Sequence, residues 1–213
     1  MKLYTYHQSS ASYRVRIALK LKGIAVDEAY IDLTKGDQST ADYTAVNPQK
    51  LVPSLIVGDD ILTQSIAIME YLEETHPAPP ILPNEPMARA QSRAIAMAIA
   101  GDISAINNLK IRNHLKSDFG ATDDDVKTKW IQHWITDGFT ALEALLVRSR
   151  HTGTFCVGDF PTIADCCLVP QMFNARRFQC DLAPFPTIVR ITDACEALSA
   201  FAAAHPSKQA DAA

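Results

Sequence analysis

The chain has 213 residues, of which 47% are hydrophobic, and a formal net charge of −4. This length allows one large or two small domains, and the hydrophobic fraction is enough to form their cores without disulfides. A mildly acidic chain lacks the excess positive charge that binds nucleic acids or anionic membranes, so we expect neither as a partner. Any anionic substrate must meet locally placed cations.

Cysteine usage and the N-terminal residues indicate a cytoplasmic protein. The cysteines are odd in number, lie in the second half of the chain, and show no CxxC or metal-ligand spacing. They are Cys156, Cys166, Cys167, Cys180 and Cys195. We therefore expect free thiols in a reducing compartment, with no disulfide framework and no metal site. The first residues form no apolar signal region, and no run approaches 18 uninterrupted apolar residues.

The first 75 residues alternate between strand and helix patterns. The predicted strands cover residues 3–6, 26–33, 54–57 and 61–63. A helix is predicted over 12–21, where Gly23 ends it, and another begins at Ser65. The order strand, helix, strand reads as a βαβ unit, and the last two strands form a hairpin. This half of the chain is therefore predicted to be an α/β domain.

Five prolines between His76 and Pro86 mark a linker, because proline cannot continue a helix. Beyond them the hydrophobic spacing is helical. The predicted helices cover residues 87–115, 123–147, 162–177 and 186–204. Thr162 and Asp165 have the spacing of a capping box at one helix start. We expect two domains, an α/β domain over 1–80 and an all-α domain over 86–213.

Ser9, Ser10 and Ser12 follow the first predicted strand at the start of a helix. The first turn of a helix has unpaired N–H groups and partial positive charge, which stabilise an anion such as a thiolate. The segment contains no cysteine, so a thiolate acting here would belong to a bound cofactor. Serine also caps helices at this position, and the segment by itself favours that simpler role.

Two further features point to a ligand. Val52–Pro53 precedes a predicted strand and is a candidate cis peptide bond, with an ordinary trans proline as the alternative. A cis bond would turn the Val52 N–H and C=O outward, where an extended peptide can pair with them. Ser65, after Gln64, begins a helix whose first turn suits a carboxylate or is simply capped. Together with Ser9, these features describe a cradle for a short anionic peptide that carries a thiol.

These motifs resemble those of zeta-class glutathione transferases, and the resemblance covers essentially the whole chain. The matching segments are the run from Ser9 to Leu19, Asn47-Pro48, Val52-Pro53, Gln64-Ser65 and Ile163-Ala164-Asp165. The resemblance implies a thioredoxin-like N-terminal domain (βαβ-ββα), an all-helical C-terminal domain, a homodimer, and glutathione as cofactor. One position departs from the family, since Ala11 stands where cysteine is usual.

The resemblance also implies which residues bind the cofactor. In that pattern Ser9 hydrogen-bonds the glutathione sulfur with help from Ser10, and the remaining positions hold the peptide. These are Gln49 and Val52 for the cysteinyl-glycine backbone, Gln64 and Ser65 for the γ-glutamyl carboxylate, and Asn108 from the second domain.

The substrate positions implied by the resemblance lie in the second domain. They are Asn107, Asn108, Lys110 and Arg176, and Arg176 is the first candidate for stabilising negative charge that develops on the substrate. Gln8 and Lys110 occupy positions where a related isomerase carries arginines. This departure leaves the exact substrate open.

The implied activity is glutathione-dependent cis–trans isomerisation of maleylacetoacetate to fumarylacetoacetate in tyrosine or aromatic-acid breakdown. Addition of a thiolate makes the cis double bond temporarily single, so that rotation becomes possible. The alternatives are isomerisation of maleylpyruvate from gentisate, general glutathione conjugation or dehalogenation, and a non-catalytic module with this fold that docks partners.

Overall fold

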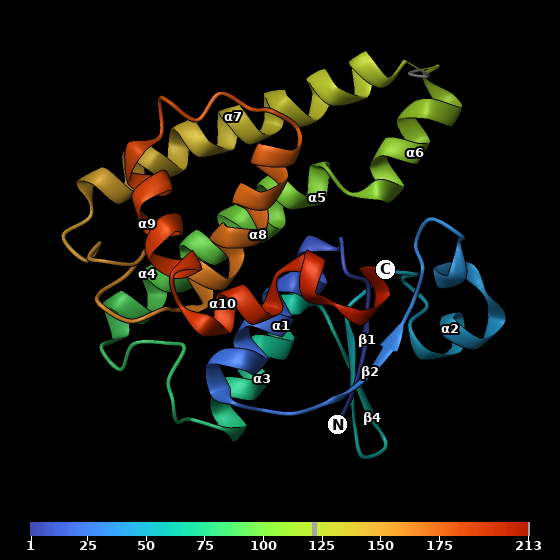
Figure 1. Cartoon of the computed structure of the whole chain (residues 1–213), viewed down its shortest axis with the longest axis horizontal. Helices are drawn as coiled ribbons and strands as arrows, with labels where there is room; N and C mark the ends of the chain where they lie inside the picture. Colours follow the sequence, from blue (N-terminus) through green and yellow to red (C-terminus); the bar gives the residue numbers. More distant parts are fainter. Residues whose placement is uncertain (121–122, 213) are drawn as a thin grey trace. The chain divides into compact units, whose positions relative to one another are not determined.

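The computed structural model describes residues 1–120 and 123–212, which form two compact units (Figure 1). Unit 1 contains Met1–Leu82 and the residues from Glu196 onward, and unit 2 is Pro83–Cys195. The expected domains, 1–80 and 86–213, therefore differ from these units at the C-terminal end. The two divisions differ because helix α10 (Ser199–Ala204) packs against helix α1 (Ser10–Lys22), which belongs to unit 1.

Unit 1 is built on a four-stranded mixed sheet with the order β2-β1-β3-β4. The strands are β1 (Lys2–Thr5), β2 (Asp27–Tyr30), β3 (Ser54–Val57) and β4 (Asp60–Thr63). Strand β1 pairs parallel with β2 and antiparallel with β3, where Leu3 lies opposite Leu55. The parallel pair requires a crossover, which α1 supplies. The predicted thioredoxin-like arrangement is confirmed.

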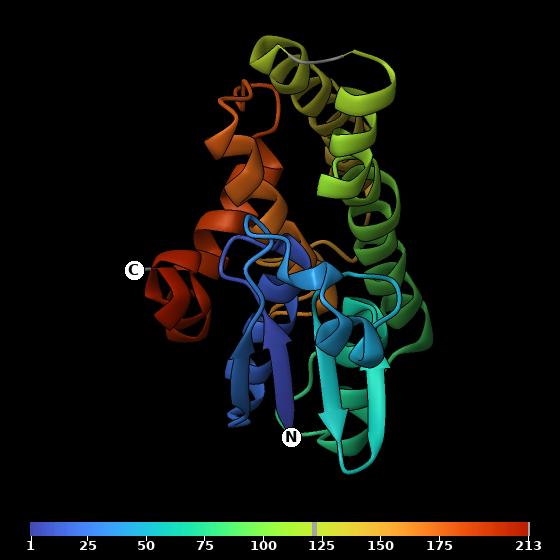
Figure 2. The ribbon, with the colours of Figure 1, turned by 90° about the vertical axis from the view of Figure 1, so that its right-hand side faces the viewer.

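Helix α1 forms where the sequence supplies both of its ends. The Ser9 hydroxyl caps its start, and Gly23 ends it in the left-handed region with φ 66°. Its Val15 and Ile17 side chains are fully buried. Helices α1 and α3 (Ser65–Thr75) cover one face of the sheet, and the short helix α2 (Ala41–Val46) lies on the other (Figure 2).

Unit 2 is helical, as predicted. Its helices are α4 (Pro86–Met97), a π-helical segment (Ala98–Ile103), α5 (Ser104–Ile106), α6 (Leu109–Asp118), α7 (Asp124–Arg148), α8 (Ile163–Arg177) and α9 (Pro186–Glu196). By length and composition alone the run Pro86–Asp118 is apolar enough to cross a membrane. Core helices of globular domains can be equally long and apolar. Within unit 2, α4 packs against α8.

Two predicted helices are interrupted. The helix expected over 87–115 breaks before α6, because Asn108 is extended (φ −61°, ψ 147°) and its Oδ1 accepts from the Lys110 N–H at 2.9 Å. The helix expected over 186–204 stops at Glu196, and Leu198 is extended before α10 begins. Hydrophobic spacing runs through both breaks, so periodicity alone did not reveal them.

The predicted capping box at the start of α8 is confirmed. The Asp165 carboxylate accepts hydrogen bonds from the Thr162 N–H at 2.7 Å and from the Thr162 hydroxyl at 2.9 Å. It also accepts from the Cys156 N–H at 2.8 Å, so it ties the preceding loop to the helix. Burial raises the pKa of Asp165 although these hydrogen bonds oppose the shift.

Candidate functional site

Ser9 is held in place by its backbone and by its cap. Its N–H donates to the Tyr6 carbonyl at 3.0 Å, and its carbonyl accepts from the Tyr13 N–H at 2.8 Å. Its Oγ accepts from the Ser12 N–H at 3.2 Å. A hydroxyl has one donor proton besides its acceptor lone pairs, so capping leaves the Ser9 O–H able to donate to an anion. The capping role and the thiolate role are therefore compatible.

The loop that carries Gln49 and Val52 is organised by a buried asparagine. The Asn47 Oδ1 accepts from the Gln49 N–H at 3.0 Å, and its Nδ2 donates to the Leu51 carbonyl at 2.8 Å. The Val52–Pro53 bond is cis, the candidate form that the sequence had left beside an ordinary trans proline. Val52 is only 6% exposed, yet within residues 1–120 and 123–212 no protein group hydrogen-bonds its backbone N–H or C=O. Backbone donors and acceptors without a protein partner can pair with an extended peptide, so these two groups suit a bound peptide.

Gln64 and Ser65 lie at the start of α3. Gln64 has φ 70°, in the left-handed region that non-glycine residues rarely adopt. Its Nε2 donates to the Gln49 Oε1 at 3.0 Å, so the fold brings these two predicted cofactor residues together. The buried Arg14 guanidinium donates to the Ser65 Oγ at 3.3 Å. A cation beneath a helix N-terminus favours a carboxylate at this point.

Unit 1 therefore fits an extended peptide with a carboxylate at one end and a thiol at the other. The starts of α1 and α3 supply N–H groups and partial positive charge, and the Val52 backbone supplies a donor and an acceptor. Ser10 is the first residue of α1 and belongs to the same helix start.

The predicted substrate residues lie in unit 2. The Arg176 Nη2, at the end of α8, is 3.4 Å from the Asp193 Oδ1, and the two side chains are 41% and 64% exposed. Such an exposed pair contributes only about 0–1 kcal/mol, so a substrate anion can replace it. Asn107 donates through Nδ2 to the Ile103 carbonyl at 3.1 Å, while Asn108 caps α6. Lys110 is exposed.

Sequence reasoning did not single out Arg112. It follows Asn108 by one helical turn, so the two residues share a face of α6. Its side chain is half-buried, and in the described part of the chain its buried Nε has no hydrogen-bond acceptor. Burial lowers the pKa of Arg112, and the charge of Arg177 lowers it further. The i, i+4 spacing from Asn108 was the signal that could have identified this cation.

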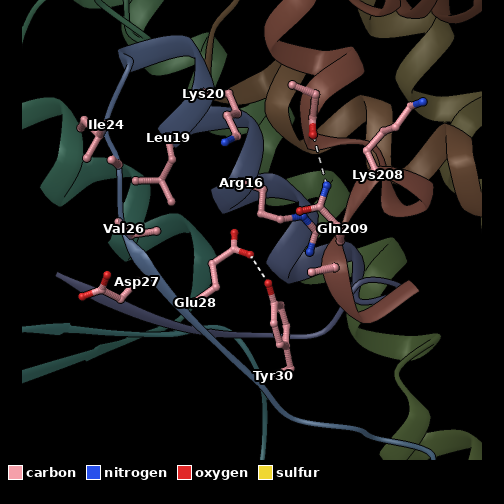
Figure 3. A pocket seen from close by; sticks show the side chains of 13 residues that line it. Arg16, Leu19, Lys20, Ile24, Val26, Asp27, Glu28, Tyr30, Lys208 and Gln209 are labelled. Atoms are coloured by element: carbon pink, nitrogen blue, oxygen red, sulfur yellow. Dashed lines mark hydrogen bonds between the residues drawn. The ribbon is translucent and has the colours of Figure 1, made fainter. Parts of the chain in front are cut away.

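Unit 1 also has a cavity of about 530 Å³ that is separate from the predicted cofactor residues (Figure 3). It lies between α1, β2 and the C-terminal segment, residues 203–212. Its polar lining includes Arg16, Lys20 and Glu28. The Tyr30 hydroxyl donates to the Glu28 carboxylate at 2.8 Å, and burial followed by this hydrogen bond raises the pKa of Tyr30 to about 12. None of the predicted cofactor residues lines this cavity.

Comparison with known proteins matches residues 3–80 to the glutathione S-transferase N-terminal domain. The chain is 45% identical to a probable maleylacetoacetate isomerase of Vibrio cholerae over 99% of this chain and 97% of that one. It is 45% identical to a maleyl pyruvate isomerase, a bacterial zeta-class glutathione S-transferase in holo form, with a TM-score of 0.97 and full coverage of both chains. A maleylacetoacetate isomerase of Methylobacterium extorquens AM1, with bound malonate and GSH, is 41% identical with a TM-score of 0.96, again over the full length of both.

Proposed function

The chain belongs to the zeta class of the glutathione S-transferase family, and on that premise we propose that it isomerises maleylacetoacetate to fumarylacetoacetate with glutathione as cofactor. The observation that carries the proposal is Ser9, whose O–H remains able to donate at the start of α1 after its Oγ has accepted the capping hydrogen bond. Relatives that span the whole chain carry isomerase names, and solved relatives hold GSH.

Glutathione is proposed to lie along unit 1. The Val52 N–H and C=O pair with its peptide backbone, and Gln49 supports that contact from the neighbouring loop. The first turn of α3 at Ser65, with the Arg14 cation behind it, binds the γ-glutamyl carboxylate. Gln64, fixed through its hydrogen bond to Gln49, closes this end of the site. Asn108 is assigned to the cofactor by family resemblance.

When bound, glutathione supplies a thiol that acts as the nucleophile toward the cis double bond. A free thiol with a pKa near 8.5 is only a few per cent ionised at neutral pH. Ser9 donates a charge-assisted hydrogen bond, worth about 1.5–3 kcal/mol, which lowers the thiol pKa by about one to two units. Ser10 and the partial positive charge of the α1 N-terminus assist. This activation requires no general base.

Cations and amides of unit 2 are proposed to bind the keto acid. Arg176 contacts a carboxylate or the carbonyl oxygen on which negative charge develops, because a positioned cation there lowers the barrier. Asn107 and Asn108 offer amide groups, and Lys110 offers a further cation. Arg112 is added to these residues because its buried Nε has no hydrogen-bond acceptor in the described part of the chain. The malonate in a solved relative supports a site for a small dicarboxylate.

The chain is expected to convert maleylacetoacetate at a rate well above the non-enzymatic reaction with glutathione. The measurement is the kcat/KM of the purified protein for maleylacetoacetate and for maleylpyruvate under the same conditions, and we expect the larger value for maleylacetoacetate. The full-length likeness to a maleyl pyruvate isomerase keeps the smaller acid as the second candidate. Conversion of neither acid would contradict the proposed function.

Replacing Arg176 by alanine is expected to reduce kcat/KM for the keto acid by about 10- to 100-fold, because one charge-assisted hydrogen bond is lost. The affinity for glutathione, measured by calorimetry, should change little, since the proposed cofactor contacts lie elsewhere. Arg148→Ala is a matched control, because Arg148 is exposed on α7 and, within the described residues, its Nε donates to the carbonyl of Ala144 on the same helix. An equal loss in the control would argue against a specific role.

We also propose that the protein is a cytoplasmic homodimer. The family resemblance supports the dimer, and a mildly acidic chain whose described cysteines form no disulfide fits a reducing compartment.

A further inference from the structure

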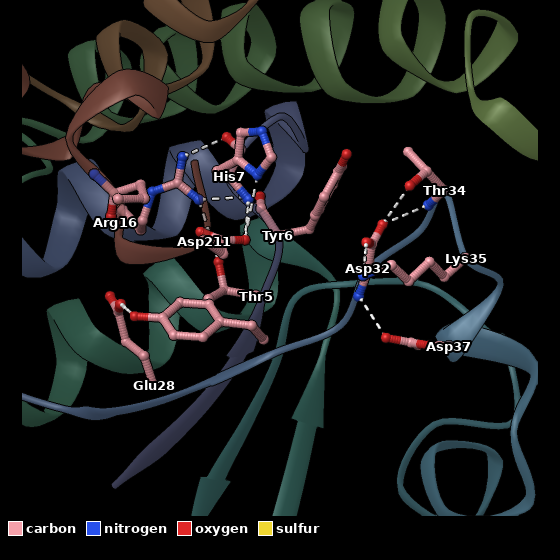
Figure 4. Close-up of polar contacts among 12 residues, drawn as sticks. Thr5, Tyr6, His7, Arg16, Glu28, Asp32, Thr34, Lys35, Asp37 and Asp211 are labelled. Carbon is pink, nitrogen blue, oxygen red and sulfur yellow. Dashed lines mark hydrogen bonds and ion pairs between the residues drawn. The ribbon is translucent and has the colours of Figure 1, made fainter. Parts of the chain in front are cut away.

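The C-terminal segment of unit 1 contacts the turn that precedes Ser9, residues 6–8 (Figure 4). The Asp211 Oδ2 accepts a hydrogen bond from the His7 backbone N–H at 2.9 Å. The same oxygen lies 3.3 Å from the His7 Nδ1. These residues are 204 positions apart in the sequence, so only the fold brings them together.

Arg16 holds the same turn by donating hydrogen bonds to the carbonyl groups of the turn. Its guanidinium donates to the Tyr6 carbonyl at 3.2 Å, the His7 carbonyl at 2.9 Å and the Ala204 carbonyl at 3.3 Å. Arg16 is 1% exposed, and burial lowers its pKa to about 10 although the charges of Glu28 and Asp211 oppose that shift. The turn lies outside regular secondary structure, so these hydrogen bonds are what fix its backbone.

The turn contacts Ser9 directly, since the Ser9 N–H donates to the Tyr6 carbonyl at 3.0 Å. We propose that Asp211 is a positioning residue: by fixing the His7 peptide from the C-terminal segment, it sets the direction of the Ser9 hydroxyl toward the glutathione sulfur. This inference rests on the proposed function of Ser9. The direction matters because a hydrogen bond weakens steeply as it departs from linearity.

Other hydrogen bonds of the C-terminal segment fold the segment itself, so the positioning role of Asp211 can be tested separately from the packing of the segment. Gln209 donates through Nε2 to the Ala203 carbonyl at 3.1 Å and to the His205 carbonyl at 2.9 Å. These bonds fold the segment without touching the turn. The Asp211 Oδ1 is buried, and within the described residues it has no hydrogen-bond partner. Among the described residues the hydrogen bonds of this carboxylate therefore go to His7, and its charge also acts on Arg16, which holds the same turn.

Three variants test the proposal. Asp211→Ala removes the acceptor, Asp211→Asn retains an amide oxygen that can accept from the His7 N–H, and Gln209→Ala loosens the segment elsewhere. The first readout is the pKa of the glutathione thiol in the binary complex, from ultraviolet absorbance of the thiolate against pH without keto acid. The second is amide hydrogen exchange at His7 in the protein without glutathione.

Asp211→Ala is expected to raise the bound thiol pKa by about half to one unit, and so to lower kcat near neutral pH by about 3- to 10-fold. Its His7 amide should exchange faster, while Asp211→Asn should restore most of both properties. Gln209→Ala should leave the thiol pKa unchanged. An unchanged thiol pKa in Asp211→Ala, or an equal rise in Gln209→Ala, would overturn the proposal.

The double variant Ser9→Ala/Asp211→Ala distinguishes this inference from the proposed function. If Asp211 acts through Ser9, the double variant should have the thiol pKa of Ser9→Ala alone, because the two effects are not additive. A raised pKa in Ser9→Ala with none in Asp211→Ala rejects only the role of Asp211. No rise in Ser9→Ala rejects the proposed role of Ser9 and, with it, any action of Asp211 through that residue.

Discussion

Replacing Ser9 by alanine is expected to raise the pKa of the bound glutathione thiol by about one to two units and to lower kcat by about 10- to 100-fold near neutral pH. The cause is the loss of one hydrogen bond to the thiolate from a hydroxyl whose oxygen already accepts from the Ser12 N–H at 3.2 Å. Titration of the thiolate by ultraviolet absorbance measures the pKa, and steady-state kinetics measure kcat.

Two further variants separate activation from capping. Ser12→Ala is the matched control, because the Ser12 hydroxyl is buried in the same turn and has no partner in the described part of the chain; its thiol pKa should equal that of the wild type. Ser9→Asp keeps an excellent helix cap but places a negative charge beside the sulfur, so it should raise the thiol pKa more than alanine does. An unchanged pKa in Ser9→Ala would mean that Ser10 or backbone N–H groups activate the thiol.

Replacing Lys22 by methionine is expected to lower the free energy of unfolding by about 3–5 kcal/mol, because it leaves the Glu73 carboxylate buried without its cation. The Lys22 Nζ lies 2.6 Å from the Glu73 Oε2, and the two side chains are 0% and 6% exposed. Lys22 also donates to the His76 and Pro79 carbonyls at 2.7 and 3.0 Å. The pair thus joins α1, α3 and the proline segment. Urea unfolding at constant pH measures the change.

Lys20→Met is the control for this prediction, because Lys20 is exposed on the same helix and methionine has a similar helix propensity. Its effect should stay within about 0.5 kcal/mol. The double variant Lys22→Met/Glu73→Gln should recover much of the lost stability, since glutamine is uncharged and still accepts from the Ile81 or Leu82 N–H. A loss below about 1 kcal/mol in Lys22→Met, or additive losses in the double variant, would contradict the role of the pair.

The features that the sequence predicted well are governed by short-range chemistry. Gly23 ends α1 because its left-handed backbone suits glycine, and Thr162 with Asp165 forms a capping box within one helical turn. The interruption before α6 was missed although Asn108 is a good N-cap, because the apolar spacing on both sides continued one helical pattern.

The sequence by itself determined the α/β-then-helical order, the helix start at Ser65 and the family, because caps, periodicity and motifs are local. It also placed Ser9 near a helix start, although the predicted range began at residue 12 and α1 begins at Ser10. Only the tertiary structure decided which distant groups meet. It placed Gln49 beside Gln64, buried Arg14 beneath Ser65, and joined the C-terminal segment to the turn before Ser9 through Asp211. Such contacts depend on how sheet, helices and tail pack, and packing between residues far apart in the chain leaves no periodic pattern in the sequence.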